Sequence, residues 1–75
     1  MQKINIQIDI KTLRRALTRE YTYVEMGNLI DEPQANIHKF LKEKTARQDI
    51  KLFIRLCILA GIEPMSLITI EKGEN

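Results

Sequence analysis

The chain has little of several residue types that small proteins use for stability or chemistry. Its 75 residues include one cysteine, two prolines, three glycines and no tryptophan, and aromatic residues make up 5%. The single cysteine, Cys57, allows no internal disulfide and no thiolate metal site. No apolar run approaches the roughly 20 residues that a membrane-spanning helix needs, and the N-terminus has no apolar segment of the signal-peptide kind. We therefore expect a cytoplasmic protein that does not enter a membrane.

Residue groups that would support catalysis or metal binding are missing from the sequence too. His38 is the only histidine, so neither a histidine pair nor a useful cysteine–histidine pair is present for zinc. The sequence has no Ser–His–Asp set, no glycine-rich phosphate loop and no carboxylate pair in a plausible cleft. Cys57 is surrounded by apolar residues, and we expect a buried, unreactive thiol, because desolvation raises a thiol pKa. We therefore expect no enzyme, no cofactor and no metal site.

The residues that are present suit one small folded domain. Apolar residues make up 44% and charged residues 29% of the chain, which fits a soluble globule. The chain is too short for a second core, so we interpret residues 1–75 as one domain. The net charge is only +2, but residues 11–47 hold eight basic and five acidic residues. A domain of this size has a thin stability margin, so we also expect oligomerisation.

Both ends of the chain have the alternating pattern of strands. Residues 2–8 alternate isoleucine with polar residues, and residues 67–71 read LITIE. Period-two alternation with β-branched residues predicts two strands, and because a lone strand leaves its backbone polar groups unpaired, we expect the two to pair. A two-stranded ribbon is marginal by itself, so we further expect its isoleucines to cover a leucine face of the helix over residues 49–60. The leucines of that face are Leu52, Leu56 and Leu59.

The middle of the chain has the helical period instead. Asp9 is placed to cap a helix over residues 10–20. Thr22 and Glu25 have the spacing of a capping box at the start of the next helix. Gly27 costs roughly 1 kcal/mol relative to alanine inside a helix, which indicates the close approach of a neighbouring helix. The residues of these two helices expected on the buried side are Ile10, Leu13, Leu17, Tyr21, Tyr23, Met26 and Ile30.

The stretch DEPQANIHKFLKEK, residues 31–44, predicts a helix with a narrow apolar side. Asp31 is placed as its N-cap, with Gln34 completing a capping box, and Pro33 is tolerated in a first turn. The apolar side is formed by Ile37, Phe40 and Leu41, and the outer side by Ala35, His38, Lys39 and Lys42. A helix built in this way presents its polar side to a partner.

The segment 49–60 is the most apolar helical segment. Its apolar residues form two faces, so the helix is either central or shared with a partner. The first face is formed by Ile50, Phe53, Ile54 and Cys57, and the second by the three leucines named above. Gly61 is placed to end this helix, and Pro64 to begin another short one.

The order and spacing of these segments resemble the Cro/repressor-type helix-turn-helix family, also called XRE or lambda-repressor-like. The motif is two short helices joined by a tight turn, the second with an exposed polar face. The residues that match its apolar positions are Met26, Ile30, Ile37 and Phe40, with Gly27 at its small-residue position. IHKFLKEK is similar to the end of the family's recognition helix, and CILAGIEPMSLI to the junction of its fourth and fifth helices. The resemblance covers residues 10–68 and implies a mainly α, five-helix domain, here extended by the strand-like termini.

The resemblance also implies how the chain would contact double-stranded DNA. The base-reading residues would be Gln34, Ala35, His38 and Lys39. Glutamine can bond adenine and lysine can donate to guanine in the major groove. The phosphate-contacting residues, which set register without reading sequence, would be Tyr23, Lys42, Lys44, Arg47, Arg14 and Arg15.

Two departures from the family pattern keep a second function open. The family usually has glycine where this chain has Asp31, although aspartate tolerates the left-handed conformation better than most residues. It usually has an apolar residue where this chain has Glu32, and two carboxylates near phosphates disfavour DNA binding. The first hypothesis is a sequence-specific, DNA-binding transcriptional regulator of the kind found in phages and mobile elements, acting as a homodimer on a pseudo-palindromic operator. The alternative is a helix-turn-helix-fold module that binds protein, such as an antirepressor that inactivates a repressor-type partner.

Overall fold

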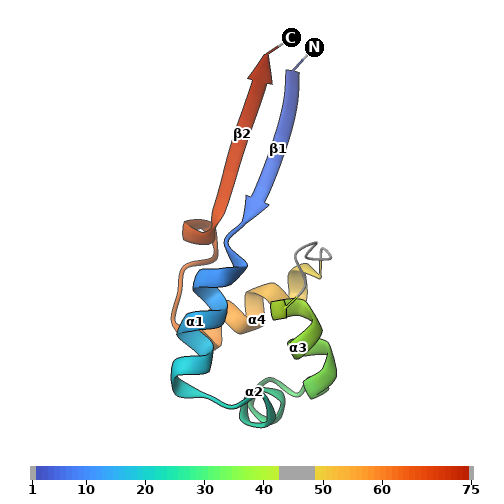
Figure 1. Ribbon diagram of the computed structural model, residues 1–75, viewed down its shortest axis with the longest axis vertical. Coiled ribbons are helices and arrows are strands. Elements are labelled where there is room, and N and C mark those ends of the chain that lie inside the picture. The colour runs from blue at the N-terminus through green and yellow to red at the C-terminus, as the bar shows by residue number, and fades with distance from the viewer. Residues whose placement is uncertain (1, 43–48, 75) are drawn as a thin grey trace.

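The computed structural model describes residues 2–42 and 49–74. The elements are β1 (Gln2–Ile8), α1 (Ile10–Glu20), α2 (Tyr23–Ile30), α3 (Gln34–Lys42), α4 (Ile50–Ala60), the short 3₁₀ helix η1 (Pro64–Leu67) and β2 (Ile68–Glu74). The helices form a body, and the two strands form a ribbon that extends away from it (Figure 1). The domain is therefore mainly α and elongated, with extents of 46 × 21 × 17 Å.

The predicted helix starts are confirmed for α1 and α2. The Asp9 carboxylate accepts a hydrogen bond from the Thr12 backbone N–H at 3.1 Å and from the Thr12 hydroxyl at 2.6 Å. These two bonds hold the pKa of Asp9 below its usual value. Thr22 and Glu25 form the reciprocal capping box, with bonds of 2.8 and 3.1 Å. Each cap satisfies amides that have no partner inside the helix.

The end of α4 follows the predicted glycine, but the next helix is shorter than expected. Gly61 has a φ of 70°. Its N–H donates to the Ile58 carbonyl at 3.1 Å, and the Ile62 N–H donates to the Cys57 carbonyl at 2.9 Å. This pair of bonds is a Schellman ending. After it, Pro64 begins only the four-residue 3₁₀ helix η1, so the described residues hold four α-helices and the expected fifth is not seen.

The core lies inside the helical body and includes residues from all four α-helices. Its buried members are Leu13, Leu17, Met26, Ile37, Phe40, Leu41, Leu52, Phe53, Leu56, Cys57 and Leu67. Cys57 is buried as predicted, and that burial raises the pKa of its thiol. No α-helix in the described part of the chain is long and apolar enough to cross a membrane.

The prediction for the faces of α4 is wrong in part. Phe53 and Cys57 are buried, but they share the core with Leu52 and Leu56, while Ile50 and Ile54 face solvent. A helix packed on one side can bury only one stripe. The buried stripe combines two of the four residues of the first predicted face with two of the three leucines of the second. Positions 52, 53, 56 and 57 follow the 3–4 spacing of a single helix side.

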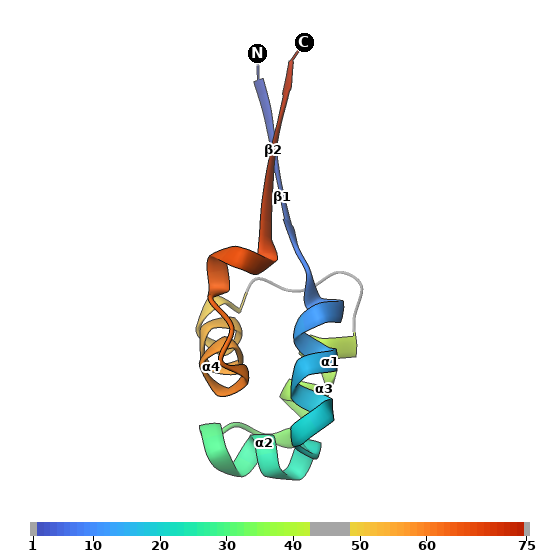
Figure 2. The ribbon, with the colours of Figure 1, turned by 90° about the vertical axis from the view of Figure 1, so that its left-hand side faces the viewer.

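The termini pair as predicted, but the ribbon does not lie where it was expected. β1 and β2 are antiparallel, with Ile6 opposite Ile70 and Ile8 opposite Ile68. Ile8 and Ile68 pack against the core at the base of the ribbon, where the Asp9 N–H donates to the Leu67 carbonyl at 2.8 Å. Beyond that point the ribbon leaves the body (Figure 2).

The expectation that the ribbon covers the leucines of α4 is therefore wrong. Leu52 and Leu56 are already buried in the body, and Leu59 is partly buried against the same core. α1 packs against α4, so no free leucine face remains for the strands. The isoleucines beyond the base of the ribbon are exposed instead.

Candidate functional site

The turn between α2 and α3 is closed by backbone hydrogen bonds around a residue in the left-handed conformation. Asp31 has φ 53° and ψ 54° and ends α2. Its N–H and that of Glu32 both donate to the Gly27 carbonyl. The prediction that Asp31 caps α3 is wrong, because a residue that ends α2 in this conformation does not have the extended backbone of an N-cap. Asp31 instead adopts the left-handed conformation, which aspartate tolerates better than most residues.

The start of α3 is consequently later than predicted. The helix begins at Gln34, and the carbonyl of Pro33 accepts from the N–H groups of Asn36 and Ile37 at 3.0 and 3.3 Å. Pro33 thus stands just before the helix. Three residues, Asp31 to Pro33, therefore separate α2 from α3.

Gly27 makes this tight turn possible. A Cβ at Gly27 would lie 2.7 Å from the carbonyl oxygen of Glu32 and 3.6 Å from the backbone nitrogen of Gln34. Separations below about 3.5 Å are inside the optimal contact distance of heavy atoms. A close approach to Gly27 is thus present, but the tight contact is with the turn and not with a neighbouring helix, because the first residue of α3 lies at ordinary contact distance.

The inner side of α3 is anchored in the core. Ile37, Phe40 and Leu41 are buried, as the helical period predicted. Arg14 of α1 is half-buried, and its Nη1 donates to the Leu41 carbonyl at 3.3 Å. This bond satisfies a carbonyl in the last turn of α3, where a cation is also favoured by the helix dipole. Arg14 therefore has a structural role in holding the C-terminal end of α3.

The outer side of α3 brings together the four residues singled out as base readers. Gln34, Ala35, His38 and Lys39 are all exposed and line one open hollow of about 620 Å³. Tyr23, at the start of α2, is half-buried and lies beside this group. Its ring centroid is 4.7 Å from that of His38, with the two planes inclined at 50°. The N-terminal end of α2 and the middle of α3 thus meet at one surface.

Glu32 has a partner that the sequence did not indicate. Its Oε1 accepts from Nη1 of Arg55 on α4 at 3.2 Å, and its Oε2 accepts from Nδ2 of Asn36 on α3 at 2.9 Å. Arg55 was missed because no local pattern relates residues 23 positions apart. The bond to Arg55 compensates the Glu32 charge and ties the turn to α4.

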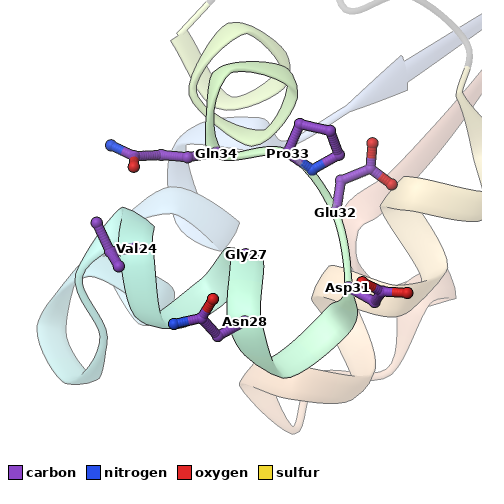
Figure 3. Close-up of a pocket in the computed structure, with 7 residues that line it drawn as sticks. All are labelled: Val24, Gly27, Asn28, Asp31, Glu32, Pro33 and Gln34. Carbon is purple, nitrogen blue, oxygen red and sulfur yellow. The ribbon is translucent and has the colours of Figure 1, made fainter.

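A smaller hollow of about 380 Å³ follows the turn itself (Figure 3). It is lined by Val24, Gly27, Asn28, Asp31, Glu32, Pro33 and Gln34. Figure 3 shows the side chain of Gln34 extending to one side of the turn and those of Asp31 and Glu32 to the other. The two carboxylates are therefore directed away from the first residue of the outer face of α3.

The predicted phosphate-contacting residues that the structure describes come from α1, α2 and α3. Lys42 is exposed at the end of α3, and Arg15 is exposed on α1. Lys44 and Arg47 lie outside the described residues. Within the described ranges, no group of three histidine, cysteine or acidic side chains is placed to hold a metal ion.

Comparison of the chain with protein-family models, with curated proteins and with solved structures found no match.

Proposed function

We propose that the protein is a sequence-specific DNA-binding regulator of transcription that reads the major groove with α3. The observation that supports this most directly is the division of α3 into two sides. Its inner side is fixed in the core by Ile37, Phe40 and Leu41, while Gln34, Ala35, His38 and Lys39 share one exposed surface. A helix anchored in this way can enter the major groove without losing its packing.

The charges around α3 favour an anionic partner. The described helix contains Lys39 and Lys42 in its last turn and no acidic residue. The negative charge of Glu32 disfavours DNA binding, but Glu32 is paired with Arg55. The other carboxylate of this turn, Asp31, is exposed. The surface offered to DNA is therefore less acidic than the sequence suggests.

A dimer would suit a pseudo-palindromic site, with one α3 in each of two major grooves about 34–36 Å apart. Such a protein would regulate by blocking the access of polymerase, and its activity would depend on concentration or on a protein partner.

A second function, protein binding by the same fold, is favoured by exposed apolar residues on α2. Val24 is 55% and Leu29 60% exposed, and Val24 lines the same hollow as the exposed Asp31. An antirepressor could use such a surface to occupy a repressor-type partner. The salt dependence of binding distinguishes the two functions. DNA binding through several phosphates weakens steeply as the salt concentration rises, whereas binding through an apolar protein interface does not.

The proposal is tested by selection of binding sites from random DNA duplexes at low salt. We expect enrichment of one motif, with two half-sites related by inverted symmetry. Recovery of duplexes without any sequence preference would refute the regulator and leave the protein-binding function as the better explanation.

Two lysines of α3 give a matched pair of variants for the selected site. Lys39→Ala should relax the preference at one base position, with a loss of roughly 1–3 kcal/mol there. Lys42→Ala should weaken all sequences about equally and lower the slope of log affinity against log salt by roughly one. Indistinguishable effects of the two variants would argue against base reading by α3.

A further inference from the structure

Tyr23 is anchored in the helical body, and its ring contacts an exposed residue of α3. It is the first residue of α2, and it packs against the core. Its ring centroid lies 4.7 Å from that of His38, with the two planes inclined at 50°. Aromatic pairs prefer separations of this size and tilted arrangements to face-to-face stacking. Tyr23 thus connects the packed body to the outer side of α3.

This contact restricts a side chain that would otherwise rotate freely. His38 is exposed, and exposed side chains exchange rotamers on the picosecond-to-nanosecond timescale. A side chain that becomes ordered only on binding lowers the affinity, because its rotamer freedom is lost at that moment. The Tyr23 ring orders the imidazole beforehand, because tyrosine has only two side-chain torsions and this one is packed against the core.

Orientation decides what an imidazole can read. A neutral imidazole has one N–H donor and one acceptor nitrogen at fixed places on its ring, whereas the ammonium group of Lys39 has three rotatable donors on a flexible stem. The base pairs differ in the pattern of donors and acceptors at their major-groove edges. An imidazole that is held in one orientation therefore discriminates between base edges, whereas one that rotates adapts to several.

We propose that Tyr23 is a positioning residue for base reading, because its ring holds the His38 imidazole in the orientation that reads one base pair. The inference rests on the proposed DNA-binding function. It goes beyond that function, since the family resemblance implies only a phosphate contact for Tyr23. A phosphate contact would use the hydroxyl group and set register without reading sequence, whereas positioning uses the ring. The two roles therefore predict different effects for the hydroxyl group and for the ring.

Selection of binding sites with variant chains separates the two roles. Tyr23→Leu removes the ring but keeps an apolar side chain against the core, and it should reduce the discrimination at one base position roughly two- to tenfold. His38→Ala should relax the preference at the same position. Tyr23→Phe keeps the ring and should retain the wild-type preference.

Tyr21→Leu is the matched control for loss of an aromatic ring. Tyr21 also packs against the core, and among the described residues the ring in contact with His38 is that of Tyr23. The control should therefore retain the wild-type preference, whatever its effect on stability. Loss of the same base preference in Tyr21→Leu would refute the proposal, because it would show a general effect of loosening the body.

A double variant tests whether the two residues act as one unit. In a chain that carries His38→Ala, adding Tyr23→Leu should cost no further discrimination at that base position, because effects within one interaction are not additive. Additive losses would refute the proposal. Equal losses in Tyr23→Phe and Tyr23→Leu would also refute it, since they would assign the role to the hydroxyl group. So would a uniform weakening of all sequences by Tyr23→Leu with the preference unchanged, which would leave Tyr23 as a backbone contact.

Proton–carbon NMR of the free protein tests the ring contact without DNA. His38 is the only histidine, so its imidazole gives one set of signals. The ring current of an adjacent aromatic side chain displaces these signals from their positions in the unfolded chain. We expect displaced signals in the wild type, Tyr23→Phe and Tyr21→Leu, and their loss in Tyr23→Leu. Unfolded-like signals in the wild type would refute the proposal even where selection yields a motif. Displaced signals without any enriched motif would instead refute the DNA-binding function, and the proposal with it.

Discussion

Replacing Gly27 by alanine tests the geometry of the turn that positions α3. Two effects of opposite sign compete in this substitution. Removing glycine from a helix interior should stabilise the protein by roughly 0.5–1 kcal/mol. The added methyl group, however, would lie 2.7 Å from the carbonyl oxygen of Glu32. That oxygen belongs to the backbone, so relief requires movement of the turn and not merely of a side chain.

The magnitude follows from these two terms. Overpacking of this kind typically destabilises by about 1–3 kcal/mol, so the net loss is about 1 kcal/mol. For a domain of this size, 1 kcal/mol corresponds to a shift of about 4–8 °C in Tm. The decisive quantity is the sign, because without the steric contact Gly27→Ala would raise the Tm by a similar amount. The same displacement would move Gln34, so any DNA binding should weaken more than the loss of stability explains.

Thermal and urea unfolding measure directly whether Gly27→Ala stabilises or destabilises the protein. Asn28→Ala is the matched control, because Asn28 is the next residue of α2 and is exposed. Alanine has the higher helix propensity, so this control should be neutral or stabilising by a few tenths of a kcal/mol. A Gly27→Ala variant that melts at or above the temperature of the wild type would refute the close approach at this turn.

Two further substitutions address the anchoring of α3 and the strain in the turn. Phe40→Ala should destabilise the protein by roughly 3–5 kcal/mol, which is a large fraction of the stability of a small domain. Circular dichroism should then show a largely unfolded chain at 37 °C. A native-like melt would contradict the burial of this ring. Asp31→Gly should stabilise by roughly 0.5–1 kcal/mol, because glycine adopts a φ of 53° without the penalty of a side chain. Asp31→Asn removes only the charge and should change the Tm little, so an equal gain from both variants would assign the effect to charge instead.

Local spacing in the sequence determined much of this fold. Asp9, Thr22 with Glu25, and Gly61 act within three or four residues of their partners, so their hydrogen bonds can be inferred from spacing alone. The pairing of the termini followed from two alternating segments that needed partners. The buried side of α3 and the exposed set from Gln34 to Lys39 followed from the helical period. What that exposed set binds remains a proposal.

Only the tertiary structure decided the features for which the sequence allows more than one arrangement. Asp31 is of a residue type that can serve either as the N-cap of α3 or as the left-handed residue that ends α2. It ends α2, because Gly27 allows the turn to close against that helix. The helix α4 has more apolar residues than one side can hold, so packing against α1 selected Leu52, Phe53, Leu56 and Cys57 and left Ile50, Ile54 and Ile58 outside. Glu32 forms an ion pair with Arg55 of α4, which is 23 residues away along the chain. The ribbon left the body because the leucines expected beneath it were already buried, a result that no local pattern encodes.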